Sequence, residues 1–110
     1  MQKYYQYGRL FACLEVIEAN GWLPSPTTLS VLYRQFEPSR FSYLLRNHRR
    51  KLNRMNSETA QILEQEMIKI FHALPVESFP IIQSFQQQKE LSSGYYDQMV
   101  KLNQELVAVS

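Results

Sequence analysis

The stretch from Arg46 to Arg54, RNHRRKLNR, concentrates positive charge in a chain whose formal net charge is only +2. It carries five cations and no acidic residue. Residues 34 to 54 hold seven of the twelve lysines and arginines and one acid, Glu37, whereas the remainder holds five basic and nine acidic residues. Guanidinium groups suit phosphate because their planar fork binds two oxygens at once. Such a charge asymmetry is typical of a surface that faces a polyanion.

The hydrophobic spacing places these cations on one amphipathic helix, capped by Ser39 and running to about Asn53. An α-helix turns about 100° per residue, so its apolar positions share one face. Those positions are Phe41, Leu44, Leu45, His48 and Leu52. The candidate nucleic-acid-binding residues lie around the rest of the helix, and they are Arg40, Tyr43, Arg46, Arg49, Arg50, Lys51 and Arg54.

Like charges on a helix that lacks an acidic residue repel one another by a few tenths of a kcal/mol per pair. Bound phosphates would relieve this repulsion and release counterions. An outward tyrosine such as Tyr43 can stack on an unpaired base. Two other interpretations stay open, namely a solvated helix face and a surface that docks on an acidic protein. We expect Arg46, Arg49, Arg50 and Arg54 to be the central phosphate contacts.

The other polar residues form no recognisable catalytic or metal-binding motif. His48 lies on an apolar stripe, which predicts a hydrogen-bonded core histidine, and Cys13 is expected to be a small buried thiol. The glutamates between positions 58 and 66 lack a second cluster of ligands, and no Gly-rich phosphate loop, CxxC or HExxH is present. We therefore expect no catalytic activity, no cofactor and no metal.

The composition is that of one small domain spanning residues 1–110. A chain of 110 residues with 45% hydrophobic residues can bury a core. The single cysteine excludes an internal disulfide, which favours a reducing compartment. No apolar run approaches the roughly 20 residues of a membrane span, and the N-terminus lacks a signal sequence. We expect a cytoplasmic protein with no membrane contact.

Helical periodicity dominates the whole sequence and predicts a single compact all-α bundle of about five helices. The predicted helices span 3–19, a short segment after Ser25-Pro26 that stops at Pro38, 39–53, 58–74 and 84–107. Asn20-Gly21 should end the first helix and Ser84 should cap the last. The predicted inward residues are Tyr7, Leu10, Phe11, Leu14 and Ile17 in the first helix, Ile62, Leu63, Ile70 and Phe71 in the fourth, and Phe85, Leu91, Tyr95, Met99, Leu102 and Leu106 in the last.

Gly94 falls inside the last predicted helix. A glycine there costs about 1 kcal/mol relative to alanine. It is either a tolerated glycine, with or without a kink, or the mark of a close approach between two helices.

Two blocks of the sequence carry a family resemblance. YGRLFACLEVIEAN, from Tyr7 to Asn20, resembles the "lGrLfAvLE" helix in the C-terminal part of the type I-C CRISPR large subunit. FPIIQSFQQQKELSSGYYDQM, from Phe79 to Met99, is similar to the "FP … Q … F … GYYHQ" ending of the same family. The order and separation of the blocks also fit, although Asp97 stands where the family usually has histidine. A small subunit of another type I system therefore stays open.

The resemblance implies a non-catalytic small subunit of the Cascade surveillance complex, made separately from the large subunit. Such subunits line the belly of the complex and hold the displaced non-target strand, which stabilises the R-loop. The implied partners are single-stranded non-target DNA, the large subunit, backbone subunits that carry guide RNA, and further copies of the same subunit. In complexes of this kind base pairing reads the sequence while protein cations hold the backbone.

Two alternatives to this function remain. The chain could be a scaffold subunit whose basic helix docks on an acidic partner protein. It could also be a small enzyme, which would need a cavity that holds His72 with Glu66 or Glu77.

Overall fold

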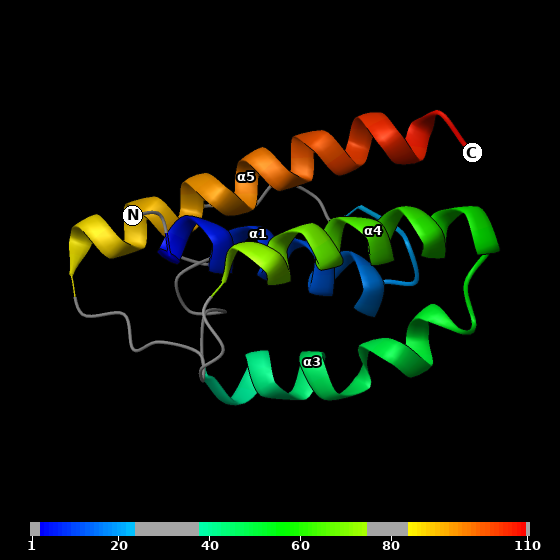
Figure 1. Ribbon diagram of the computed structural model, residues 1–110, viewed down its shortest axis with the longest axis horizontal. Coiled ribbons are helices and arrows are strands. Elements are labelled where there is room, and N and C mark those ends of the chain that lie inside the picture. Colours follow the sequence, from blue (N-terminus) through cyan, green and yellow to red (C-terminus); the bar gives the residue numbers. More distant parts are fainter. Residues whose placement is uncertain (1–2, 24–37, 75–83, 110) are drawn as a thin grey trace.

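The computed structural model describes residues 3–23, 38–74 and 84–109, which form four α-helices and no strand (Figure 1). The helices are α1 (Lys3–Glu18), α3 (Pro38–Leu52), α4 (Ser57–Ala73) and α5 (Phe85–Val107). The all-α prediction is confirmed for this part of the chain. The short helix predicted after Ser25-Pro26 lies outside the described residues. Of the described helices, none combines the length and hydrophobicity that a membrane span requires.

Local sequence signals set the ends of the helices. Asn20 and Gly21 have φ angles of 59° and 89°, and the Gly21 amide donates a 2.8 Å hydrogen bond to the Val16 carbonyl, which ends α1 as predicted. Ser84 begins α5 with a capping box, because its hydroxyl accepts from the Gln87 amide at 3.1 Å and its own amide donates to the Gln87 side chain at 3.2 Å. These two predicted boundaries are confirmed.

The two middle helices each begin one residue earlier than predicted. Pro38 is the first residue of α3, so Ser39 lies inside the first turn and is not its cap. A proline fits the first helical position because the amide hydrogen that it lacks would have no partner there. α4 begins at Ser57 because Asn56 is its cap, with a side-chain oxygen that accepts from the Glu58 amide at 2.9 Å.

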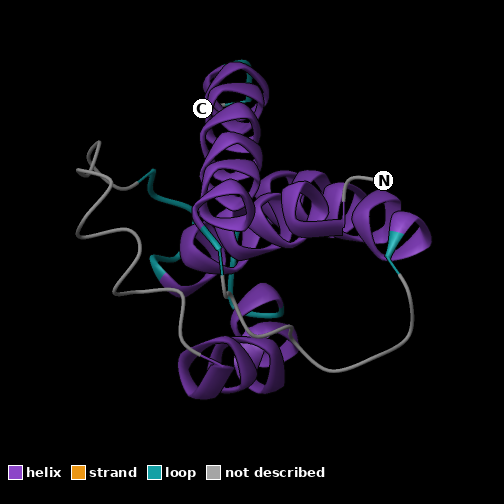
Figure 2. Ribbon diagram, turned by 90° about the vertical axis from the view of Figure 1, so that its left-hand side faces the viewer, coloured by secondary structure: helices purple, strands orange, loops and turns teal. Residues whose placement is uncertain are grey.

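Helix α1 is the central element of the bundle. It packs against α3, α4 and α5, and both views show α3 on the opposite side of α1 and α4 from α5 (Figures 1 and 2). The five residues predicted to face inward are all buried, but so are Ala12, Cys13 and Val16 on the other side of the helix. The apolar residues of α1 therefore extend around most of the helix, as expected for a helix at the centre of a bundle.

The crossing of α1 and α5 depends on two glycines. A Cβ atom on Gly94 would overlap the carbonyl oxygen of Tyr5, and a Cβ atom on Gly8 would overlap the carbonyl oxygen of Leu91. The two helices therefore touch backbone to backbone, each through a glycine of its own. This geometry favours the close-approach interpretation of Gly94, and only glycine fits at either position.

The apolar faces of α4 and α5 agree with the prediction except at two phenylalanines. The buried residues among those predicted are Leu63, Ile70, Leu91, Tyr95, Leu102 and Leu106, while Ile62 and Met99 are half-buried. Phe71 is 42% exposed and Phe85 is 70% exposed, so their predicted inward orientation is wrong. Phe85 is the first residue of α5, where the helix extends beyond its packing. In α4, Glu66 takes the buried position at the edge of the stripe opposite to Phe71.

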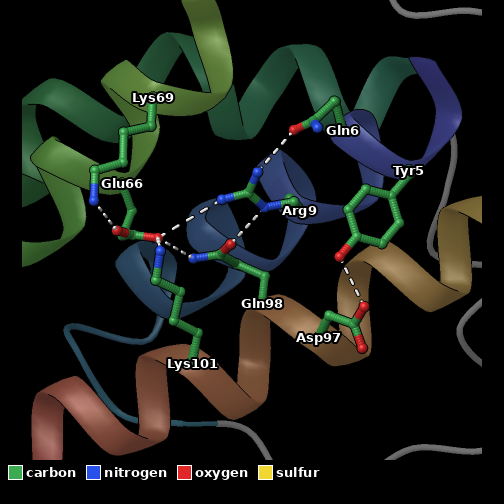
Figure 3. A network of polar contacts seen from close by, with 8 residues as sticks. All are labelled: Tyr5, Gln6, Arg9, Glu66, Lys69, Asp97, Gln98 and Lys101. Atoms are coloured by element: carbon green, nitrogen blue, oxygen red, sulfur yellow. Dashed lines mark hydrogen bonds and ion pairs between the residues drawn. The ribbon is translucent and has the colours of Figure 1, made fainter. Parts of the chain in front are cut away.

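Glu66 lies at the centre of a buried polar network that joins three helices (Figure 3). Its carboxylate accepts hydrogen bonds from Gln98 at 2.9 Å, Lys101 at 3.0 Å and Lys69 at 3.2 Å. The Arg9 guanidinium lies 3.8 Å away and donates to the Gln98 side-chain oxygen at 2.8 Å. The carboxylate is therefore matched by cations from α1, α4 and α5.

These contacts decide the charge state of Glu66. Burial alone would raise the pKa of this carboxyl group, but the hydrogen bonds from Gln98, Lys101 and Lys69 outweigh burial and hold the pKa below its usual value of 4.5. Glu66 therefore stays ionised in the folded protein at neutral pH. Its charged form contributes to stability above the unfolded-state pKa, and that contribution is lost as the pH falls through the folded-state value.

A second polar contact links α1 and α5 near the start of α1. The Tyr5 hydroxyl donates a 2.7 Å hydrogen bond to Asp97, and this bond is the main reason that the pKa of Tyr5 is raised (Figure 3). Asp97 is the position at which the sequence departs from the family pattern. In this chain the aspartate acts as a partner for Tyr5.

We predict that Gly94→Ala destabilises the fold. The new methyl group would force α1 and α5 apart, which should cost about 1–3 kcal/mol or more even after the gain in helix propensity. Urea unfolding followed by circular dichroism measures the change. Ser93→Ala is the matched control, because Ser93 is the exposed neighbour on the same helix and should change stability little. Equal stability of the two variants would contradict the close crossing.

We also predict that Glu66→Gln lowers the free energy of unfolding by about 2 kcal/mol at pH 7, because it leaves three cations without their carboxylate. The difference from wild type should shrink as the pH falls below about 4.5, where Glu66 becomes protonated in the unfolded chain. Urea unfolding at several pH values measures this difference. The control is Glu64→Gln, which removes an exposed ion pair worth less than about 1 kcal/mol. A difference that stays constant as the pH falls would show that the Glu66 charge is not responsible.

Candidate nucleic-acid interface

The basic helix α3 is held on the bundle by its apolar face. Phe41, Leu44 and Leu52 are buried, and the Phe41 ring packs edge-on against Tyr7 of α1, with the ring centroids 6.1 Å apart. Leu45 is half-buried and packs against the same core. This anchoring fixes which side of α3 faces outward.

The six cations of the predicted site divide into two that pair with a described carboxylate and four that do not. Arg40 lies 3.2 Å from Glu15 of α1, and Arg49 lies 2.9 Å from Glu64 of α4. α3 carries no acid of its own, as noted from the sequence, but its neighbours supply one for each of these two arginines. Each ion pair bridges α3 to another helix.

The Arg40–Glu15 pair is part of the packing between α1 and α3. The Glu15 side chain is 13% exposed and that of Arg40 is 39% exposed. Burial raises the pKa of Glu15, and the positive charge of Arg40 opposes that shift. The structure therefore gives Arg40 a role in positioning α3, in addition to its predicted place at the edge of a phosphate surface.

Four cations of the predicted set have no carboxylate within ion-pair distance in the described part of the chain. They are Arg46, Arg50, Lys51 and Arg54. The three arginines are exposed and Lys51 is half-buried. Arg46 and Arg50 lie one turn apart, about 6 Å along the helix axis. Arg46, Arg50 and Lys51 therefore keep an excess of positive charge on α3. Arg54, which was predicted to lie on the same helix, is in the turn that follows it, because α3 ends at Leu52.

Tyr43 and Asn47 complete the outer face of α3. The Tyr43 side chain is 48% exposed, which leaves its ring accessible. Asn47 donates a 2.8 Å hydrogen bond to the Tyr43 carbonyl and accepts a 2.6 Å hydrogen bond from the Arg50 guanidinium. Asn47 was not among the predicted site residues. It links the Tyr43 backbone to Arg50 and orients that guanidinium.

The remaining candidates for chemistry do not converge. His48 is half-buried with Nδ1 hydrogen-bonded to the Leu45 carbonyl, as expected for a histidine at the edge of a core. His72 is exposed, while Glu66 is buried in its cation network, and Glu77 lies outside the described residues. Among the described residues, the histidines, cysteine and acids form no group of three that could hold a metal.

Cys13 is fully buried in α1, as predicted. Burial, and to a smaller extent the charge of Glu66, raise the pKa of its thiol to about 12. The thiol is therefore protonated at neutral pH and screened from solvent.

A pocket of about 410 Å³ lies at the end of the bundle where α1 terminates. It is lined mainly by Trp22, Leu23, Met55, Leu106 and Val107, with Asn20, Gly21, Asn56 and Thr59. None of the predicted nucleic-acid-binding residues lines this pocket. The basic face of α3 and this apolar pocket are thus separate features of the surface.

The pairing of Glu15 and Glu64 with arginines of α3 was not predicted from the sequence. Arg49 and Glu64 are 15 positions apart and belong to different helices. One signal was present, since the short connection between α3 and α4 keeps the beginning of α4 near the end of α3. An acid near the beginning of α4, such as Glu64, is therefore placed where it can pair with an arginine near the end of α3.

Comparison with known proteins identifies the family. A family model described as "CRISPR-associated protein (Cas_Csd1)" matches residues 1–103. No curated protein and no solved structure matches the chain. The matched range includes α1, α3, α4 and most of α5, so it covers both the packed core and the basic helix. The chain belongs to the Cas_Csd1 family of CRISPR-associated proteins.

Proposed function

We propose that this chain is a non-catalytic subunit of a type I CRISPR surveillance complex that holds the displaced non-target DNA strand through the outer face of α3. Three kinds of support agree. The family is CRISPR-associated, and the two ends of the sequence resemble the C-terminal part of the type I-C large subunit. Among the described residues, Arg46, Arg50 and Lys51 of α3 have no carboxylate within ion-pair distance. The last of these carries the proposal, because it alone concerns contact with nucleic acid.

The chemistry of this face suits a sequence-independent contact. Arg46, Arg50 and Arg54 are exposed, and charged side chains of this kind bind phosphate oxygens of any sequence. Each phosphate that a cation neutralises releases counterions, so binding is expected to weaken with salt. The exposed Tyr43 ring offers a stacking surface for an unpaired base, which favours a single strand over a duplex.

The proposed partners follow from this role. They are single-stranded non-target DNA, the large subunit, the backbone subunits that carry guide RNA, and further copies of this chain within the complex. Multiple copies would add contacts along one strand, so the assembled complex should bind more tightly than the free chain. No catalytic step, metal or cofactor is assigned to this subunit.

A scaffold role is the second candidate, and one observation favours it. Arg40 and Arg49 already pair with carboxylates from other helices, at 3.2 and 2.9 Å. The unpaired arginines of the same helix could pair in the same way with acids on a neighbouring subunit. α3 would then hold the complex together without touching DNA.

We predict that Arg46→Ala/Arg50→Ala weakens binding of the full chain to labelled single-stranded DNA. The plot of log K against log salt should become shallower by about 1.4, since each lost phosphate contact on a single strand removes about 0.7. Fluorescence anisotropy across a salt series gives both quantities. The matched control is Lys3→Ala/Lys89→Ala, which removes the same charge from α1 and α5 and should leave the slope unchanged.

The same variants distinguish the scaffold role when tested in the assembled complex. Intact assembly with weaker single-strand binding supports the proposed function. Loss of assembly by the arginine variant, with no loss in the lysine control, supports docking on an acidic partner. Unchanged DNA binding in an intact complex would overturn the assignment of α3 as the nucleic-acid surface.

A further inference from the structure

The ion pair between Arg49 and Glu64 differs from the other cation contacts of α3. The guanidinium and carboxylate are 2.9 Å apart, and the side chains are 59% and 42% exposed. The Arg40–Glu15 pair, in contrast, has an acid that is only 13% exposed. Arg49 is therefore held by a partner that water, salt and other anions can reach. Exposed pairs of this kind are weak and are screened by salt.

Glu64 faces an open pocket whose lining is described completely. This pocket of about 380 Å³ lies between the end of α3 and the start of α4. Its polar lining residues are Asn53, Ser57, Gln61 and Glu64. All of the lining residues belong to the described part of the chain, and Glu64 is the acidic one among them. A phosphate backbone that follows the outer face of α3 would meet this carboxylate beside Arg49.

We propose that Glu64 competes with nucleic acid for Arg49. It pairs with Arg49 in the unbound chain and so limits the affinity of the α3 surface for phosphate. The inference rests on the proposed function and refines it. Arg46 and Arg50 are available without displacing any acid, while Arg49 becomes a phosphate contact only when it leaves Glu64. Glu64 acts here as a positioning residue, through Arg49.

The exchange is chemically balanced. Arg49 donates N–H groups to carboxylate oxygens in the free chain and to phosphate oxygens in the bound chain, so one charge-assisted contact replaces another. The released Glu64 carboxylate stays at an exposed site where water can solvate it. The contact between Arg49 and Glu64 must be given up on binding, and this loss is the reason that Glu64 lowers the affinity.

The test is a double-mutant cycle on the full chain, with labelled single-stranded DNA of mixed sequence as the probe. Glu64→Gln should raise affinity several-fold at low salt. Because Arg49 contacts phosphate in both complexes, the log–log salt dependence should change little. In the Arg49→Gln background, the same Glu64→Gln change should have little effect. Glu90→Gln is the charge-matched control on α5, away from α3, and should leave both quantities near those of wild type.

Each outcome decides the inference. A gain that disappears with Arg49→Gln supports it. A gain of equal size in Glu90→Gln, or one that persists without Arg49, would show a general effect of net charge and overturn it. Unchanged binding in Glu64→Gln, while the Arg46→Ala/Arg50→Ala variant binds more weakly than wild type, overturns this inference and leaves the proposed function standing. Absence of binding by wild type and by Glu64→Gln overturns both.

Discussion

The backbone contact between α1 and α5 is the constraint on which the rest of the structure depends. Gly8 and Gly94 each face a carbonyl oxygen of the opposite helix, so the two backbones meet with no side chain between them. This closeness allows α1 to lie at the centre, where α3, α4 and α5 all pack on it. Because α1 is apolar around most of its circumference, a displacement of α5 would disturb every other interface in the bundle.

The protein uses its charges in two ways that the small net charge conceals. Inside the bundle, the single carboxylate of Glu66 collects Arg9, Lys69 and Lys101 from three helices and ties the core together. Cations also outnumber carboxylates at α3, but there they lie toward the surface and not around one buried carboxylate. The first arrangement specifies the fold, and the second leaves a surface that an external anion can satisfy.

The sequence predicted those parts of the structure that depend on neighbouring residues. Asn20-Gly21 and Ser84 act through hydrogen bonds within one turn, so their capping roles could be recognised directly. The described parts of the two sequence blocks that carry the family resemblance fall on α1 with the turn after it and on the first part of α5, while residues 79–83 lie outside the described residues. α1 and α5 are the helices that cross through the glycines, and the family match extends over both.

The predictions failed, or were silent, where a residue depends on something distant in the chain. Periodicity could not show that Phe71 and Phe85 are exposed, or that Glu66 is buried at the other edge of the apolar stripe of α4. The acids that pair with Arg40 and Arg49 come from other helices, which no pattern within α3 indicates. The basic face itself was predictable because it follows from the helical turn alone.

The burial of Cys13 has a practical consequence for spectroscopy. It is the single cysteine of the sequence, and its thiol is both covered and protonated at neutral pH. A cysteine introduced at an exposed position such as Ser42 would therefore be the thiol that reacts with a maleimide dye or a nitroxide label. Distances from α3 to a labelled DNA strand could then be measured without first replacing a residue of the core.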